Sequence, residues 1–260
     1  MSNNLLEGKI ALVTGGSSGI GFGAAKRLKE EGATVYITGR RKEILDNAAA
    51  RLGDGVIAYQ GDVSNKEDME RLAELIKQQH GTLDIIFANA GGGKAIPFMD
   101  ATYEDYRKTF DVNVWGTYLT VQTMLPILKN GASIILNASI TAYMGLEGFG
   151  LYAATKAAVR SFARSWTTDL KTRGIRVNAV SPGVVPTEGY QTVQGMTQEA
   201  VDAYAESVAK EIPAGRAGTS EELGDAVVFL ASDLSKYITG IELTVDGGMT
   251  QVYAGNNGTM

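Results

Sequence analysis

Tyr152 and Lys156 stand four residues apart in the stretch GFGLYAATKAAV, which otherwise consists largely of glycine, alanine and threonine. Alanine favours helix and glycines precede the run, so the sequence predicts a helix that begins near Leu151. Residues four apart lie one above the other on the same helical face. A phenol and an ammonium group would therefore share one patch, and their small neighbours would leave room for a ligand.

The composition removes most other catalytic groups. The 260 residues include no cysteine and a single histidine, His80. Without cysteine the chain can form no disulfide, thiolate nucleophile or Cys-ligated zinc site, and we predict no metal site. Proton chemistry must then rest on Tyr, Lys, Ser, Asp or Glu, with a cofactor supplying the rest. The formal charge of −5 argues against a nucleic-acid partner, which requires clustered Lys and Arg.

The sequence gives no sign of a membrane protein. No apolar run approaches the ~20 residues that a spanning helix needs. The first residues, MSNNLLEGKI, lack the basic region and apolar core of a secretory signal. We therefore expect a cytoplasmic protein with a small-molecule substrate.

Short β-rich runs alternate with longer helical runs along nearly the whole chain. We expect strands at 9–14, 33–39, 55–62, 83–91, 132–139, 175–183 and 240–248. We expect helices at 19–32, 41–53, 66–79, 103–129, 151–174 and 220–232. This alternation with continuous apolar strands predicts an α/β fold, a doubly wound seven-stranded parallel sheet (Rossmann-like) with helices on both faces. We predict a single domain over residues 1–260, with a substrate lid at about 184–211 and a loose tail at about 250–260.

In such a sheet, ligands bind outside the carboxyl ends of the strands. The first strand is followed by TGGSSGIG, whose glycines at 15, 19 and 21 permit a tight turn and close backbone approach. The helix that begins there suits a pyrophosphate. Arg40 and Arg41 follow the second strand, where an NAD site usually has Asp or Glu and an arginine accommodates a 2′-phosphate. These residues favour NADP(H) over NAD(H), although a solvated arginine pair at the start of a helix is the alternative.

Polar residues also follow the next two strands. Asp62 and Asn89 could contact the rim of a bound nucleotide, although Asp62 could equally be a turn or capping residue. His80 precedes the fourth strand and so lies at the opposite edge of the sheet. We predict a solvated histidine at a helix end, where its charge would suit the helix dipole.

With these motifs in order, the chain resembles the short-chain dehydrogenase/reductase family, in its smaller single-domain branch. The matching motifs are TGGSSGIG, NAG at 89–91, NVWG at 113–116, Ser139, YAATK at 152–156, NAVSPG at 178–183 and Thr187. The resemblance spans nearly everything from Lys9 to Gly248. Ala88 stands where family members often have Asn, and Trp115 is bulkier than many residues at its position.

The resemblance implies roles for four residues. Tyr152 is the implied proton donor, or the base in the oxidative direction. Lys156, together with an oxidised nicotinamide ring, is expected to lower the pKa of that phenol and to hold the ribose hydroxyls. Ser139 is implied to hydrogen-bond the substrate oxygen. Asn113 is implied to anchor a water that links Lys156 to solvent.

The resemblance also implies a cofactor site and an assembly. The implied nucleotide contacts are Gly15, Ser17, Ser18, Gly19, Ile20, Gly21, Arg40, Arg41, Asp62, Val63, Asn89, Ala90, Gly91, Tyr152, Lys156, Pro182, Gly183, Val185 and Thr187. The family usually forms homotetramers. Phe162, Trp166 and Leu170 recur at helical spacing on the Tyr152 helix, so they belong either to the core or to a subunit interface.

Several functions remain open. We expect an NADP(H)-dependent carbonyl reductase or secondary alcohol dehydrogenase. The alternatives are an NAD-dependent dehydrogenase of a hydroxy compound and an NAD(P)-binding regulator that has lost catalysis. An enoyl reductase is disfavoured because those enzymes usually space the Tyr and Lys differently. The predicted pocket walls, residues 92–98, 140–149 and 184–196, include several apolar side chains, which is a weak hint of a ketone or ketoester.

Overall fold

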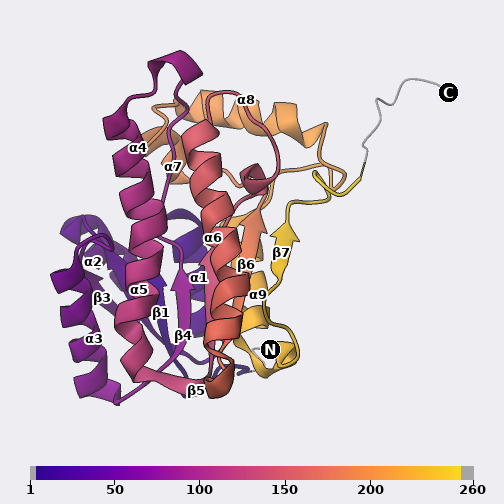
Figure 1. Cartoon of the computed structure of the whole chain (residues 1–260). Helices are drawn as coiled ribbons and strands as arrows, with labels where there is room; N and C mark the ends of the chain where they lie inside the picture. Colours follow the sequence, from indigo (N-terminus) through magenta and orange to yellow (C-terminus); the bar gives the residue numbers. More distant parts are fainter. Residues whose placement is uncertain (1–3, 253–260) are drawn as a thin grey trace.

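The computed structural model describes residues 4–252, and the segment from residue 253 onward, within the predicted tail, lies outside that range. One parallel sheet of seven strands runs through the molecule in the order β3-β2-β1-β4-β5-β6-β7 (Figure 1). Its strands are β1 (Ile10–Thr14), β2 (Thr34–Gly39), β3 (Val56–Gln60), β4 (Leu83–Ala88), β5 (Leu128–Asn137), β6 (Arg176–Pro182) and β7 (Glu242–Val245). The predicted doubly wound, Rossmann-like fold is confirmed.

Helices cover both faces of this sheet, as the continuous apolar strands predict. One face carries α1 (Gly19–Glu30), α2 (Lys42–Leu52) and α9 (Ser220–Ala231), whose buried side chains form one core with β1 and β2. The other face carries α3 (Lys66–His80), α5 (Gly116–Met124) and α6 (Gly150–Asp169). Helix α4 (Tyr103–Phe110) extends past the carboxyl edge of the sheet and buries no residue (Figure 1). Helices therefore shield both faces of the sheet from water, which leaves the ends of its strands as the place for ligands.

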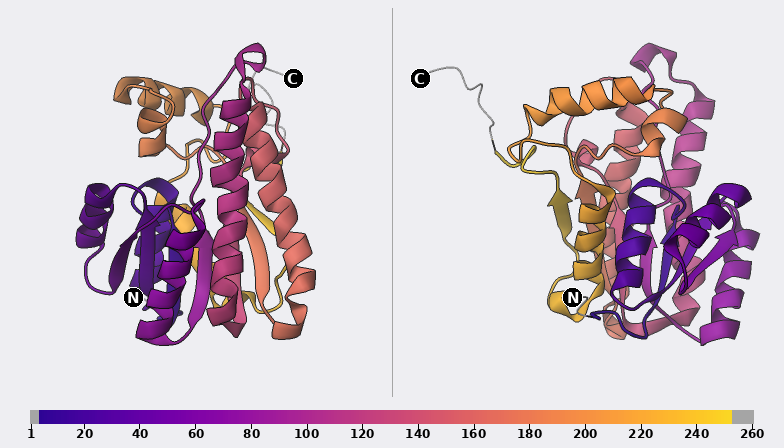
Figure 2. Two further views of the ribbon diagram at one scale, coloured as in Figure 1. Left: turned by 60° about the vertical axis from the view of Figure 1, so that its left-hand side comes forward. Right: turned by 180° about the vertical axis from the view of Figure 1, so that it is seen from behind.

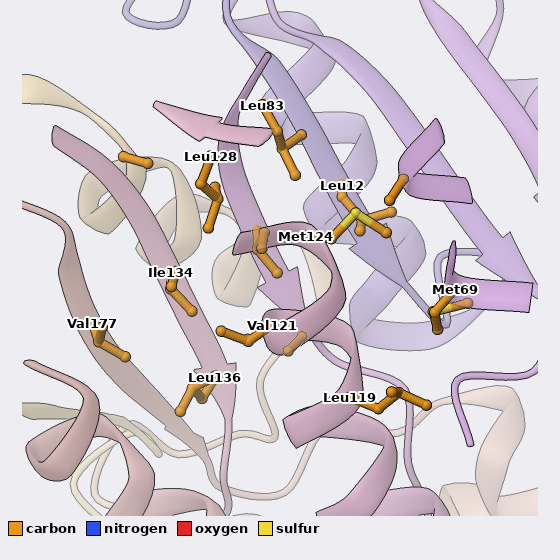
Figure 3. Packing of buried hydrophobic residues seen from close by; sticks show 14 of the residues in the cluster. Leu12, Met69, Leu83, Leu119, Val121, Met124, Leu128, Ile134, Leu136 and Val177 are labelled. Atoms are coloured by element: carbon orange, nitrogen blue, oxygen red, sulfur yellow. The ribbon is translucent and has the colours of Figure 1, made fainter. Parts of the chain in front are cut away.

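The core between the sheet and helices α3, α5 and α6 consists mainly of aliphatic side chains from both layers. Figure 3 shows Leu12, Ile134 and Val177 from the sheet beside Val121 and Met124 of α5, and all five are at most 5% exposed. On α6, Phe162, Trp166 and Leu170 are only partly buried and pack against this core from its rim. The contact with the core agrees with the first predicted role, and the subunit interface stays a prediction.

The helix predicted over residues 103–129 occurs in the expected place, but its continuity and its end differ from the prediction. A π-helical segment (Asp111–Trp115) separates α4 from α5, and a 3-10 turn (Leu125–Ile127) follows α5. Pro126 has no N–H to donate to the preceding turn, so the α-helical ladder stops there. Strand β5 then begins at Leu128, four residues earlier than predicted.

Two helices lie in the segment 184–211, where the sequence predicts a substrate lid. They are α7 (Glu188–Thr192) and α8 (Gln198–Ala209), and the Thr197 hydroxyl caps α8 by accepting from the Ala200 N–H at 3.2 Å. Both helices lie beyond the carboxyl ends of the strands (Figure 2). Among the described helices, none combines the length and the hydropathy that would be needed to cross a membrane.

Candidate active site

Tyr152 and Lys156 share one face in the first half of α6, as predicted. Lys156 is only 4% exposed, and its Nζ donates to the backbone carbonyl of Asn137 at the end of β5, at 2.6 Å. The same nitrogen lies 5.5 Å from the centroid of the half-buried Tyr152 ring. The amine is therefore held between the sheet edge and the phenol rather than being free to swing into solvent.

Asn113 lies in the π-helical segment, 2% exposed. Its Nδ2 donates to the Gly92 carbonyl and to the Thr155 hydroxyl, both at 3.0 Å, and its Oδ1 accepts from the Gly92 N–H, also at 3.0 Å. A single π turn widens a helix locally, and such turns often occur at functional sites. Here the turn places one amide side chain between the loop after β4 and helix α6.

Thr155 completes this connection, and the motif-based prediction did not include it. Its hydroxyl accepts from Asn113 and donates to the backbone carbonyl of Tyr152 at 2.6 Å. Thr155 is fully buried, which its position directly before Lys156 could have indicated. The loop, the π turn and the catalytic helix are thus joined by one chain of hydrogen bonds.

Ser139 lies beside the phenol. It follows β5 with an extended backbone, is 8% exposed, and accepts from the Thr141 N–H through its Oγ at 3.2 Å. Its hydroxyl interacts with that of Tyr152 and lowers the pKa of the phenol. The two hydroxyl groups can therefore reach the same substrate oxygen, which is the arrangement that the resemblance implies.

The pKa values of Tyr152 and Lys156 in the chain alone are set mainly by burial. Burial raises the pKa of Tyr152 to about 12, against the smaller opposing effect of Ser139. Burial also lowers the pKa of Lys156 to about 8. The expected lowering of the phenol pKa requires Lys156 together with an oxidised nicotinamide, and in the chain alone desolvation of the phenolate is the larger effect on that pKa.

The loops after β1 and β4 are tied together at the predicted pyrophosphate site. Asn89 donates from Nδ2 to the Thr14 carbonyl at 2.9 Å, and the Thr14 hydroxyl accepts from the N–H groups of Asn89 and Ala90, both at 3.0 Å. Gly15 has a φ of +66°, and an added Cβ would lie 3.0 Å from the Ala90 Cα. At Gly21 an added Cβ would lie 2.6 Å from Asn89 Nδ2. At these two positions only glycine fits.

This cradle fits a dinucleotide phosphate. The start of α1 presents backbone N–H groups at the carboxyl edge of the sheet, and that of Gly19 donates to the Glu188 carboxylate at 2.9 Å. Asn137, which also donates from Nδ2 to the Asn89 side chain at 2.8 Å, has a buried side-chain carbonyl with no partner among residues 4–252. A buried acceptor without a donor is costly, so a bound group that donates a hydrogen bond there would be stabilised.

Arg40 and Arg41 are exposed at the carboxyl end of β2, with Arg41 as the residue before α2. Within residues 4–252 neither guanidinium group forms an ion pair or hydrogen bond. The Ser17 hydroxyl lies at the end of the same strand, 3.3 Å from the position of a Cβ on Gly39, the residue before Arg40. Two unpaired cations and a hydroxyl group are a suitable set for a 2′-phosphate.

The side chains of several predicted nucleotide contacts are used in the fold itself, so these residues could contact a nucleotide only through their backbone. Val63 is 6% exposed and packs into α5, where a Cβ on Gly116 would lie 2.6 Å from its Cγ2, so its side chain belongs to the core. Asp62 accepts from the Ser64 N–H and hydroxyl at 2.9 and 2.6 Å, which is the alternative turn role. Val185 is likewise 5% exposed.

The remaining predicted contacts lie around the same cleft. Pro182 ends β6, and a Cβ on Gly183 would lie 2.7 Å from Asp246. Ser18 precedes α1, and Ile20 packs partly against the core of that face. The last predicted contacts, Gly91 and Thr187, lie beside Asn113 and Gly19 respectively. His80, in contrast, is exposed at the end of α3, at the amino edge of β4.

The geometry and the comparisons with known proteins agree. A family model described as enoyl-(acyl carrier protein) reductase matches residues 15–250. The oxidoreductase asL5 of Sarocladium schorii is 43% identical over 95% of this chain and 98% of its own. The NADP-dependent (R)-specific alcohol dehydrogenase of Lentilactobacillus kefiri is 35% identical over 94% of this chain and 98% of its own. A crystal structure of a short-chain dehydrogenase/reductase, a glucose/ribitol dehydrogenase from Brucella melitensis, has a TM-score of 0.89 and 29% identity, covering 95% of this chain and 98% of that chain.

The fold and site define a Rossmann-like oxidoreductase. The chain belongs to the short-chain dehydrogenase/reductase family and is an NAD(P)-dependent enzyme of that family.

Proposed function

We propose that the protein is an NADP(H)-dependent carbonyl reductase, acting in reverse as a secondary alcohol dehydrogenase. The observation that carries the proposal is the meeting of Tyr152, Ser139 and Lys156 at the carboxyl edge of β5. Reduction of a carbonyl adds a hydride to carbon and a proton to oxygen. A bound NADPH would supply the hydride, and the chain has to supply the proton and hold the oxygen.

Tyr152 is the proposed proton donor. Its raised pKa keeps the phenol protonated at neutral pH, which is the form that reduction requires. As negative charge develops on the substrate oxygen, the Ser139 hydroxyl donates a second hydrogen bond to it and stabilises the transition state. In the oxidative direction Tyr152 must first lose its proton so that the phenolate can accept one from the alcohol, and its raised pKa makes that deprotonation harder without a further positive charge nearby.

Lys156 is proposed to hold the nicotinamide ribose and to return a proton to Tyr152. Its Nζ is fixed on the Asn137 carbonyl, and its pKa of about 8 allows proton exchange near neutral pH. Both amide hydrogens of Asn113 are already bonded to Gly92 and Thr155. We therefore propose Asn113 as a positioning residue, and a water anchored by its side chain would depend on the remaining lone pair of Oδ1.

The preference for NADP(H) is supported by the unpaired guanidinium groups of Arg40 and Arg41 beside Ser17. The Lentilactobacillus relative is NADP-dependent by name. We propose that Arg40 takes the 2′-phosphate, because a cation and a dianionic phosphate form strong charge-assisted hydrogen bonds. Segment 184–211 is proposed as the substrate lid, on one domain that holds both cofactor and substrate.

We further propose a cytoplasmic homotetramer. Trp115 and Tyr118 are 45% and 38% exposed and stack on each other, and Phe162 stacks on the partly exposed Trp166. A hollow of about 280 Å³ lies among these rings on α5 and α6. An exposed apolar patch of this kind often marks an interface. Sedimentation of the wild-type protein beside a Trp115→Arg variant tests this, with the variant expected to form smaller assemblies.

The experiment that tests the reaction is a substrate screen in both directions with both cofactors, using Tyr152→Phe as the control. Ketones, ketoesters and secondary alcohols form the main panel. An α,β-unsaturated thioester is added because the matching family model is described as an enoyl reductase. Turnover of ketones by the wild-type protein alone supports the proposal. Cofactor binding without turnover of any substrate would favour the regulator, and turnover of the unsaturated thioester alone would favour an enoyl reductase.

A further inference from the structure

The N-terminus of α1 is capped by a residue from the lid. Ser18 precedes the helix but makes no side-chain capping bond in the described part of the chain, and the first turn contains no acidic residue. Instead the Gly19 N–H donates to the Glu188 carboxylate at 2.9 Å, across 169 residues of sequence. Glu188 is the first residue of α7, so the contact joins the proposed lid to the glycine loop.

The carboxylate lies where the proposed cofactor would place a phosphate. The N–H groups at this helix start are the anion site of the fold, and a carboxylate satisfies the same requirement as a phosphate oxygen. The two groups are both negative and cannot share one N–H at close range. We propose that Glu188 is an internal competitor of the cofactor pyrophosphate, which holds α7 against α1 until the dinucleotide displaces it.

The structure also offers the displaced carboxylate a second position. A cavity of about 320 Å³ adjoins Gly19 and Glu188, and Arg51, Phe22 and Ser220 also line it. The Arg51 guanidinium lies over the Phe22 ring, 4.5 Å from its centroid, and pairs with no carboxylate among residues 4–252. A carboxylate that leaves Gly19 can therefore turn toward this cation, where an exchange of partners keeps its charge compensated.

Movement of Glu188 would move the lid with it. Thr187, the residue directly before it, lies against the glycine loop, 3.1 Å from the position of a Cβ on Gly19. The Tyr190 backbone N–H donates to the Thr187 carbonyl, and the Tyr190 ring lies 5.9 Å from that of Tyr204 on α8. When the Glu188 carboxylate is displaced, α7 and α8 therefore move with it, so cofactor binding and lid position are coupled.

The inference rests on the proposed cofactor and is tested by binding rather than by turnover. ADP-ribose contains the pyrophosphate but no nicotinamide, so its dissociation constant reports this site without any reaction. If Glu188 competes, Glu188→Ala should bind ADP-ribose and NADPH about five to ten times more tightly than the wild type, as expected when a competing closed state held by one solvent-exposed hydrogen bond of ordinary net strength is removed. Glu188→Gln should lie between the two.

A matched control is Glu206→Ala, which removes an exposed acidic residue of α8 that makes no contact with α1. It should bind ADP-ribose as the wild type does. A general effect of net charge would tighten binding equally in both variants and would overturn the inference. A purely structural role for Glu188 would instead lower Tm and weaken binding.

The second position is tested by a double-mutant cycle with Arg51→Gln. In the wild-type background this change should weaken ADP-ribose binding, because the displaced carboxylate loses its new partner. In the Glu188→Ala background it should have no effect. Equal weakening in both backgrounds would mean that Arg51 contacts the nucleotide itself, which contradicts the exchange of partners.

The outcomes separate this inference from the proposed function. If the wild-type protein binds neither ADP-ribose nor NADPH, both fail. If it binds them and reduces ketones but Glu188→Ala binds no more tightly, the competitor role fails and the proposed reaction stands.

Discussion

Gly93 offers a direct test of the active-site geometry, because one added carbon there would meet the catalytic ring. A Cβ on Gly93 would lie 2.5 Å from Tyr152 Cγ and 2.6 Å from its Cβ. Carbon atoms at optimal separation are about 3.5–4.0 Å apart, so either the ring or the loop must move by about 1 Å. No positive φ adds strain at this position, and the effect would come from the contact alone.

We expect Gly93→Ala to lower kcat by about 10- to 100-fold, since a misplacement of about 1 Å can cost about 100-fold in rate. Overpacking of this kind typically costs about 1–3 kcal/mol of stability, which the exposed loop can relieve in part. The matched control is Gly92→Ala, where a Cβ would meet only Val193, at 4.0 Å. The assay is steady-state reduction of a ketone found in the screen, with ADP-ribose binding to confirm an intact cofactor site. A Gly93→Ala variant within twofold of the wild-type kcat would refute the reasoning.

Three further predictions follow from the same site. Arg40→Asp should reduce kcat/KM with NADPH more than with NADH, and an equal loss with both cofactors would contradict the NADP(H) assignment. Thr155→Val should lower kcat with little change in ADP-ribose affinity, because it removes the hydroxyl that joins Asn113 to the Tyr152 turn; a change in affinity alone would place Thr155 in cofactor binding instead. The folded-state pKa of Lys156, about 8, lies below its ordinary value of 10.5, so between these pH values the unfolded chain holds the proton that the folded chain has lost. The free energy of unfolding of the wild type should therefore rise relative to Lys156→Met from pH 8 to pH 10, by at most about 1.4 kcal/mol per pH unit, and chemical denaturation at several pH values that showed a constant difference would contradict this.

The predicted strands and helices agree well with the structure where a single hydrophobic pattern runs through the whole element. The central strands β1 and β4 are short, mainly apolar runs that are buried along their whole length, and a strand buried on both faces permits little else. The order of the motifs then fixes which side chains lie at the carboxyl edge. For this reason Tyr152, Lys156, Ser139 and Asn89 could be placed near one cleft from the sequence.

The misses have physical causes that lie beyond local sequence. The π turn at Asn113 is stabilised by bonds to Gly92 and Thr155, which are distant in the chain, so no local pattern signals it. The burial of the Val63 side chain is another such feature, because Gly116 leaves a space that it fills, and a cofactor contact through the Val63 backbone stays a prediction. The contact between Glu188 and Gly19 joins two segments that only the fold brings together.

The protonation of Tyr152 is a related case. The spacing of Tyr152 and Lys156 correctly predicts that the two groups share a face. It does not show how far each is buried, and burial is the larger effect on both pKa values. The lowering of the phenol pKa by Lys156 with an oxidised nicotinamide stays a prediction, and in the chain alone burial raises that pKa.

The central claim is that the Tyr152 hydroxyl donates the proton during reduction, and Tyr152→Phe tests it most directly. The measurement is ketone-dependent NADPH oxidation, with ADP-ribose binding determined on the same sample. We predict a loss of kcat of about 100- to 10,000-fold, the usual contribution of a general acid, with an unchanged dissociation constant for ADP-ribose. A variant that binds ADP-ribose normally and still turns over within tenfold of the wild type would contradict the account.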